Sequence, residues 1–141
     1  MKRKYIFGLG AIIVGIGAVG GYQGFLASNA AAAATVQHVD FTSAAFAAAQ
    51  KAEKPILIDV WASWCPTCKA QQPGIAAAQS NPANKGLVVM RINYDTQKGE
   101  MKPFNITRQS TLIAFKGGRE TGRLIAATDP AKIAALVAST R

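Results

Sequence analysis

The sequence predicts an α/β protein with a central mixed β-sheet and helices on both faces of that sheet. Apolar runs of strand length alternate with helix-like segments along most of the chain. Near the C-terminus, Gly117-Gly118 separates two strand-like runs, as in a hairpin, and one more helix-like segment follows. This order of elements gives a mixed sheet covered by helices. A chain of 141 residues favours one domain.

The N-terminal end of the chain, residues 1–34, carries an export pattern. Basic residues at positions 2–4 precede an uncharged, largely apolar run from Tyr5 to Tyr22, which is the order of a signal segment. Small residues from Ala27 to Ala34 offer A-x-A cleavage sites. The apolar run would span about 27 Å as a helix, close to a bilayer core. A cleaved signal and a membrane anchor over residues 5–26 are therefore both open.

The expected folded domain, residues 35–141, lies beyond this segment. Positive-inside orientation sends it across the membrane, which in a bacterial-type cell means the periplasm. The net charge of +9 falls to +6 without the three N-terminal basic residues, and the remaining basic residues are scattered along the chain. Nucleic-acid binding is therefore not expected, and a monomer is the default.

Local patterns account for the elements before the cysteines. Alternation over residues 35–39 predicts a short edge strand. Thr42 or Ser43 can cap a helix that ends near Lys51, because a hydroxyl accepts hydrogen bonds from first-turn amides. The nearly continuous apolar run over residues 56–61 predicts a strand buried on both faces.

The later elements follow from similar signals. Pro66 favours the first turn of a helix that runs to about Ser80. The remaining elements are a strand at 87–93, a short helix at 99–104, strands at 111–116 and 122–126, and a helix capped by Asp129 that begins at Pro130 and ends near Ser139.

Cys65 and Cys68 lie two residues apart at the start of a helix that follows a buried strand. Free N–H groups at a helix N-terminus favour a thiolate, the species that attacks disulfides. Cys68 lies one turn further on and can resolve a mixed disulfide. A structural disulfide, a zinc site and a copper(I) site are the alternatives. A four-residue loop gains little stability, and zinc needs more ligands than this pair and His38, so no cofactor is expected.

The segment 56–69, with Trp-Cys-Pro-Thr-Cys at positions 64–68, resembles the active-site segment of thioredoxins. Residues 111–118 resemble a later strand and turn of that family, and the likeness covers nearly all of residues 41–139. The resemblance implies the thioredoxin fold. Residues 46–68 are also similar to the periplasmic thioredoxin-like domain of transmembrane disulfide reductases.

The resemblance implies three catalytic roles. Cys65 would be the nucleophile, Cys68 the resolving cysteine, and Asp59 the buried carboxylate that exchanges protons with Cys68. Burial disfavours a charged carboxylate, which suits acid–base work. The alternative is that Asp59 ends its strand and pairs with Arg91 or Lys54.

The resemblance also implies a substrate-binding surface around the cysteines. Thioredoxins have a cis-proline where this chain has Ser110. A cis bond before a residue other than proline costs about 3–4 kcal/mol, so a trans bond is favoured. We expect the Ser110 hydroxyl near the sulfurs, where hydrogen bonding would shift their reduction potential. The expected substrate-binding residues are Trp64, Pro66, Thr67, Gln109, Ser110 and Thr111.

These features predict an enzyme that reduces disulfides in exported proteins and takes its electrons from a membrane thiol–disulfide donor. A disulfide-forming oxidant is the first alternative, because proline also follows the first cysteine in strong oxidants. Such oxidants usually insert a helical domain, for which residues 35–141 leave no room. A thiol copper chaperone or assembly adaptor is the second alternative.

Overall fold

The computed structural model describes residues 35–141, so the expected signal or anchor lies outside the described residues. The order of strands and α-helices is the predicted one, β-α-β-α-β-α-β-β-α. No helix in the described part of the chain is long and apolar enough to cross a membrane. The elements are β1 (His38–Asp40), α1 (Ser43–Lys51), β2 (Pro55–Trp61), α2 (Pro66–Ser80), η1 (Pro82–Asn84), β3 (Val88–Asn93), α3 (Lys98–Met101), η2 (Lys102–Phe104), β4 (Thr111–Lys116), β5 (Arg119–Ile125) and α4 (Pro130–Ala138).

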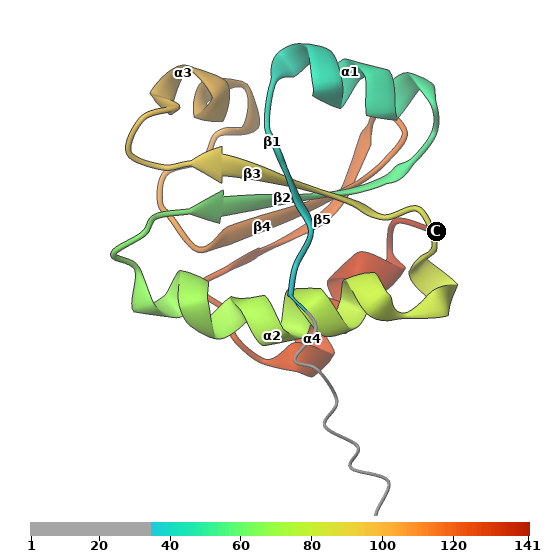
Figure 1. The fold of residues 1–141 in the computed structure, drawn as a ribbon. Helices are drawn as coiled ribbons and strands as arrows, with labels where there is room; N and C mark the ends of the chain where they lie inside the picture. The colour runs from blue at the N-terminus through green and yellow to red at the C-terminus, as the bar shows by residue number, and fades with distance from the viewer. Residues whose placement is uncertain (1–34) are drawn as a thin grey trace, which may run out of the picture.

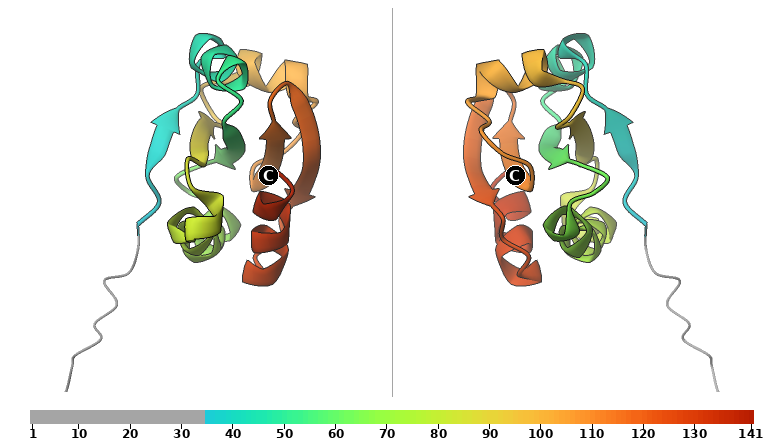
Figure 2. Two further views of the ribbon diagram at one scale, coloured as in Figure 1. Left: turned by 90° about the vertical axis from the view of Figure 1, so that its right-hand side faces the viewer. Right: turned by 90° about the vertical axis from the view of Figure 1, so that its left-hand side faces the viewer.

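The five strands form one mixed sheet in the order β1-β3-β2-β4-β5. β1, β3 and β2 are parallel to one another, whereas β4 and β5 are antiparallel to their neighbours. Figure 1 shows α1 and α3 over one face of the sheet and α2 and α4 over the other, and the side views in Figure 2 agree. β2 is the central strand, and it leads directly into the loop that carries the cysteines.

Alternation along β2 separates two hydrophobic cores. Ile56, Ile58 and Val60 belong to the core beneath α1 and α3, whereas Leu57 belongs to the core beneath α2 and α4. Because side chains alternate along a strand, Asp59 points to the same face as Leu57. The sequence thus directs one carboxylate toward α2, the helix of the cysteines.

The two cores are built from different side chains. The core beneath α1 contains four phenylalanines with ring centroids 5.1–5.8 Å apart in mostly edge-to-face contacts, an arrangement that aromatic rings favour. The core beneath α2 and α4 is aliphatic. The two helices approach closely there, because a Cβ placed on Gly74 would lie 2.9 Å from Ile133 Cδ1. This packing holds α2 firmly against the sheet. The four phenylalanines are Phe41, Phe46, Phe104 and Phe115.

Two predicted boundaries were wrong, both at sheet edges. The strand expected over residues 35–39 covers His38–Asp40, and the one expected over 122–126 begins at Arg119. Edge strands expose one side to water and tolerate charged residues, so hydrophobic alternation marks their ends poorly. The helix expected over residues 99–104 is divided into a short α-helix and a 3₁₀ turn.

Candidate active site

Cys65 and Cys68 lie at the N-terminal end of α2 and are joined as a disulfide. Cys65 is the N-cap residue, and its sulfur accepts a hydrogen bond from the Cys68 amide at 3.1 Å. Pro66 occupies the first turn, as predicted, where a missing N–H costs nothing. Both cysteines are almost completely buried. The helix end therefore provides an amide donor for a thiolate at Cys65.

Trp64 is the exposed part of the site. Its side chain is 56% exposed, although it stands next to the buried Cys65. Its indole Nε1 donates a hydrogen bond to Asp95 Oδ2 at 2.9 Å, which fixes the orientation of the ring. Pro66 is exposed and Thr67 is half-buried beside it. An exposed aromatic side chain next to a reactive sulfur is suited to contact a protein substrate.

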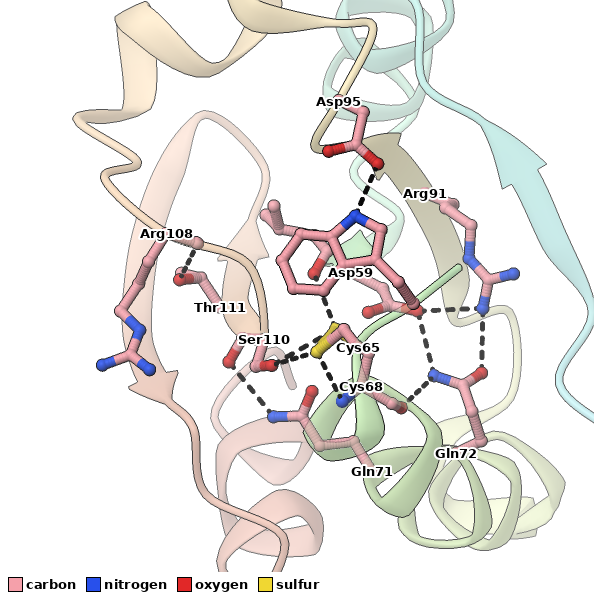
Figure 3. The surroundings of a disulfide bond; sticks show 12 residues. Asp59, Cys65, Cys68, Gln71, Gln72, Arg91, Asp95, Arg108, Ser110 and Thr111 are labelled. Carbon is pink, nitrogen blue, oxygen red and sulfur yellow. Dashed lines mark hydrogen bonds and ion pairs between the residues drawn. A yellow bond between two sulfur atoms is a disulfide. The ribbon is translucent and has the colours of Figure 1, made fainter. Parts of the chain in front are cut away.

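Ser110 lies against both sulfurs, as the family resemblance led us to expect. Its Oγ is 3.0 Å from Cys65 Sγ and 3.2 Å from Cys68 Sγ (Figure 3). Its backbone is left-handed, with φ +61°, which a proline ring, fixed near −65°, cannot adopt. The Ser110 amide donates to Val60 O at 2.9 Å. Serine at this position thus puts a hydroxyl where proline could offer no hydrogen-bonding group.

Gln71, on α2, holds the Ser110 turn in place. Its Nε2 donates to Ser110 O at 3.2 Å and to Ala127 O at 2.9 Å, and the residue is completely buried. The carbonyl of Ser110 also accepts a hydrogen bond from Ala126 N at 2.9 Å. One amide group therefore connects the cysteine helix to two loops, and these contacts fix the position of the Ser110 hydroxyl.

The two neighbours of Ser110 differ in their environment. Gln109 is half-buried at the rim of the site. Thr111 is buried as the first residue of β4, and its hydroxyl donates to Arg108 O at 2.8 Å. The Thr111 hydroxyl therefore stabilises the loop, and only Gln109 remains at the rim to meet a substrate.

Asp59 lies within β2 and is completely buried. Its Oδ2 atom lies 3.1 Å from His38 Nε2, 3.1 Å from Arg91 Nη2 and 3.2 Å from Gln72 Nε2. These residues come together because β1 and β3 are parallel to β2 and direct side chains toward α2. Asp59 is therefore not at a strand end, and it pairs with Arg91 and not with Lys54. We call His38, Asp59, Gln72 and Arg91 the carboxylate cluster.

Gln72 links the carboxylate cluster to the cysteine helix. Its Nε2 donates to Asp59 Oδ2 and also to Cys68 O at 3.1 Å, while its Oε1 accepts from Arg91 Nη2 at 2.9 Å (Figure 3). The guanidinium of Arg91 also lies 4.3 Å from the ring centroid of Trp61, a cation–π distance. Asp59 is thus tied to the first turns of α2 through a single side chain.

The roles of Gln71, Gln72 and His38 were not predicted from the sequence. Two adjacent glutamines in an alanine-rich helix were a usable signal, because a helix beside a sheet normally turns apolar residues inward. His38 gave no local signal, since its importance depends on pairing between β1 and β3. Within residues 35–141, no group of three His, Cys, Asp or Glu side chains could hold a metal ion.

Comparison with known proteins agrees with this fold and cysteine pair. The family model described as Thioredoxin matches residues 35–139. The thioredoxin of Alicyclobacillus acidocaldarius subsp. acidocaldarius is 37% identical over 84 residues, which cover 60% of this chain and 79% of the relative. A thioredoxin of Mycobacterium tuberculosis (strain ATCC 25618 / H37Rv) is 31% identical over 96 residues, 67% of this chain and 82% of the relative.

A solved structure extends the likeness to the backbone. The crystal structure of Trxlp from Edwardsiella tarda EIB202 superimposes with a TM-score of 0.69 at 37% identity, covering 72% of this chain and 98% of that one. Sequence, fold and the placement of the cysteine pair at a helix N-terminus therefore point to one family. This chain belongs to the thioredoxin family and is a thiol–disulfide oxidoreductase whose redox pair is Cys65 and Cys68.

Proposed function

We propose that this protein reduces disulfides in exported proteins outside the cytoplasm and is itself re-reduced by a membrane dithiol donor. The observation that carries the proposal is the buried carboxylate of Asp59, which Gln72 connects to the backbone of Cys68. A reductase must deprotonate its second cysteine during each turnover, and a carboxylate kept from water is suited to accept that proton. The export pattern at residues 1–34 supports the location.

The reaction has two exchange steps. In the first, the Cys65 thiolate attacks one sulfur of the substrate disulfide, a mixed disulfide forms, and the other substrate sulfur leaves as a thiolate that takes up a proton. In the second, Cys68 gives its proton to Asp59 and attacks the Cys65 sulfur, which releases the second substrate thiolate. The substrate gains two electrons and two protons, and the protein ends as the Cys65–Cys68 disulfide. A membrane dithiol restores the pair by the reverse exchange.

Two features of the site prepare Cys65 for the first step. The Cys68 amide and the Ser110 hydroxyl both lie within hydrogen-bond distance of its sulfur. Hydrogen bonds to a thiolate stabilise the attacking form. Trp64 and Gln109 border the sulfurs and would contact the substrate chain.

The reduction potential of the full chain, equilibrated against glutathione or dithiothreitol buffers, tests the direction of electron flow. A value near or below about −220 mV supports the reductase, because thioredoxins and glutaredoxins lie in that range. A value near about −120 mV, typical of a strong oxidant, would overturn the reducing direction and leave the fold and the cysteine pair unaffected.

Thiol trapping in living bacteria tests the location and the donor. A maleimide that cannot cross the inner membrane should label Cys65, the attacking cysteine, in cells with their membrane thiol donors intact. Deletion of the donors should leave the protein oxidised and unlabelled. Labelling that requires cell lysis would place the domain in the cytoplasm and contradict the proposed location.

A disulfide-forming oxidant is the second candidate, and Ser110 is the observation that favours it. Its hydroxyl adds a donor that thioredoxins with a proline at this position do not have. Extra donors stabilise the reduced, thiolate form and make a disulfide more oxidising. The same potential measurement distinguishes the two candidates.

A further inference from the structure

We infer that His38 is the group through which the buried carboxyl of Asp59 exchanges protons with solvent. This inference rests on the part of the proposed function that has Asp59 take the proton of Cys68. Asp59 is completely buried, so a proton that it accepts cannot pass directly to water. In the oxidised protein, this proton returns to Cys68 during the reverse exchange or passes to solvent. Passage to solvent requires a second titratable group between Asp59 and the surface.

The chemistry of the neighbours leaves one candidate for that group. Among the described residues, three side chains contact Asp59 Oδ2 by hydrogen bonding, and its Oδ1 has no partner. The amide of Gln72 does not titrate, and the guanidinium of Arg91 stays protonated in proteins. Only the imidazole of His38 can both accept and release a proton near neutral pH.

The position of His38 suits this transfer. Its Nε2 lies 3.1 Å from Asp59 Oδ2, a distance for direct proton transfer. Its side chain is 15% exposed and lines a groove of about 620 Å³ between β1, β3 and α2. Within residues 35–141, Nδ1 of the ring has no hydrogen-bond partner, so the second nitrogen is free to exchange with water in the groove.

Arg91 allows the imidazole to hold its place in both protonation states. Its Nη2 lies 2.8 Å from His38 Nε2 and 3.1 Å from Asp59 Oδ2. When Nε2 carries no proton, it accepts a hydrogen bond from Arg91. When Nε2 carries a proton, it donates to Asp59, and Arg91 keeps its bonds to Asp59 and Gln72. The ring therefore need not move as the proton passes.

The transfer balances in protons. Protonated Asp59 gives its proton to His38 Nε2, and the imidazolium then releases the proton on Nδ1 to water, which leaves the neutral ring protonated at Nε2. Tautomer exchange through the water of the groove restores the Nδ1–H ring, so over the full cycle one proton moves from Asp59 to solvent and no electrons are involved. Other ionisable groups on this side of the sheet will shape the pH dependence of the step; they are Asp40 on β1, Arg91 on β3 and Lys69 on α2, which lines the same groove.

The test follows the two exchange steps separately in the full-length protein. The reduced protein is mixed with an aromatic nitrobenzoate disulfide, which releases one coloured thiolate when Cys65 attacks and a second when Cys68 resolves. His38→Gln keeps an amide donor near the place of Nε2 but cannot carry a proton. A pH-indicator dye in weakly buffered solution reports the proton that the protein releases. In His38→Gln we expect both coloured phases to be unchanged, because Asp59 still accepts the proton of Cys68, and proton release to lag about tenfold behind the second phase at neutral pH.

The controls separate proton transfer from packing. In His38→Ala, proton release should lag equally and should recover most of its rate when a low concentration of imidazole is added, which would not repair a loss of packing. Val39→Thr changes an exposed neighbour on the same strand and should behave as the unmodified protein. Thermal melts report whether each variant folds.

His38 is the only histidine, so its ring signals in NMR give a second readout without any change at position 38. Those signals should differ between oxidised and reduced protein at neutral pH, and the difference should vanish in Asp59→Asn. Proton release that keeps pace with the second phase in His38→Gln, together with a slow second phase in Asp59→Asn, would overturn the role of His38 and leave that of Asp59 intact. A normal second phase in Asp59→Asn would overturn the role of Asp59 itself.

Discussion

Two groups of buried polar contacts flank the first turns of α2, one around the sulfurs and one around the carboxylate of Asp59, and they are built differently. On the sulfur side, Ser110 brings one hydroxyl into direct contact with both reacting atoms. On the carboxylate side, three side chains share one oxygen of Asp59. The first arrangement acts on the energy of a thiolate, an equilibrium property. The second suits proton transfer, which is a matter of rate.

Adjacent residues of the same helix serve these two sides. Gln71 bonds to the Ser110 turn, and Gln72 bonds to Asp59. Successive helix positions are about 100° apart, so neighbours in sequence can support separate sites. The comparison implies that variants on the sulfur side change the reduction potential, whereas variants on the carboxylate side change the rate of the second exchange.

The largest effect is expected from the cysteines, on which both sides act. Cys65→Ser should reduce disulfide reduction to the uncatalysed background, because the attacking thiolate is absent. Cys68→Ser should still attack but should accumulate the mixed disulfide with its substrate. Mass spectrometry after mixing with an oxidised protein measures that adduct. An adduct that forms equally in both variants would contradict the assignment of Cys65 as nucleophile.

Asp59→Asn should produce the next largest effect, and it should impair only the proton transfer on the carboxylate side. We expect the second phase of the nitrobenzoate assay to slow about 100-fold, the lower end of general acid–base catalysis. The first phase should be unchanged, because Cys65 has its own donors. Stopped-flow absorbance measures both phases. Slowing of the first phase by a similar factor would show that the two sides are not separate.

Ser110→Ala should affect only the sulfur side, by changing the reduction potential. Loss of the hydroxyl removes one hydrogen bond to the thiolate, so the reduced form loses stability and the potential falls. We expect about a tenfold change in the redox equilibrium constant, or about 30 mV toward more reducing values. Glutathione titration measures this shift. Ser110→Gly, which also lacks the hydroxyl and suits the left-handed backbone, should shift the potential equally. An unchanged potential in both variants would contradict a role for the hydrogen bond.

Gln71→Leu and Gln72→Leu form a matched pair that sharpens the comparison. Gln71→Leu should shift the potential in the direction of Ser110→Ala, by about threefold in the equilibrium constant. It should also lower the free energy of unfolding by about 1–3 kcal/mol, because the Ala127 carbonyl loses its hydrogen-bond partner. Gln72→Leu should leave the potential unchanged and slow the second phase about threefold. Potentials and phases are measured for both variants. The opposite assignment of the two effects would contradict the division between the sides.

The smallest effect is expected far from both sides, at the exposed pair of Glu120 and Arg123. Glu120 accepts two hydrogen bonds from the Arg123 guanidinium. This hydrogen bonding is the main reason that the pKa of Arg123 is raised. Surface ion pairs contribute at most about 1 kcal/mol. Glu120→Gln should therefore lower the free energy of unfolding by less than that, in urea titration, with no change in potential or in either phase.

Local signals predicted most of the fold. Asp129 and Thr42 cap their helices as expected, and β4 has the predicted bounds, because capping hydroxyl or carboxylate groups and buried apolar runs are properties of neighbouring residues. The edge strands were less predictable. The start of β5 at Arg119 depends on pairing with Lys116 across the hairpin, which overrides the weak strand pattern of its first residues.

The candidate site was predicted in part. Cys65, Cys68 and Ser110 were identified from spacing and from family resemblance, and the structure brings them together. The contacts of Asp59 were predicted only for Arg91. Its contacts with His38 and Gln72 join β1, β2 and α2, whose approach depends on sheet pairing and helix packing. Spacing along one chain does not encode such contacts.

The two hydrogen bonds that Gln71 donates have a consequence for how related sequences vary. Its two amide hydrogens are used by the carbonyls of the Ser110 turn and of Ala127. A proline at position 110 could not adopt the left-handed backbone seen here. The carbonyl at position 110 would then be displaced, and Gln71 would lose one of its two hydrogen-bond acceptors. Serine at position 110 and an amide side chain at position 71 should therefore occur together in related sequences. In relatives with proline at position 110, an apolar residue at position 71 should be tolerated.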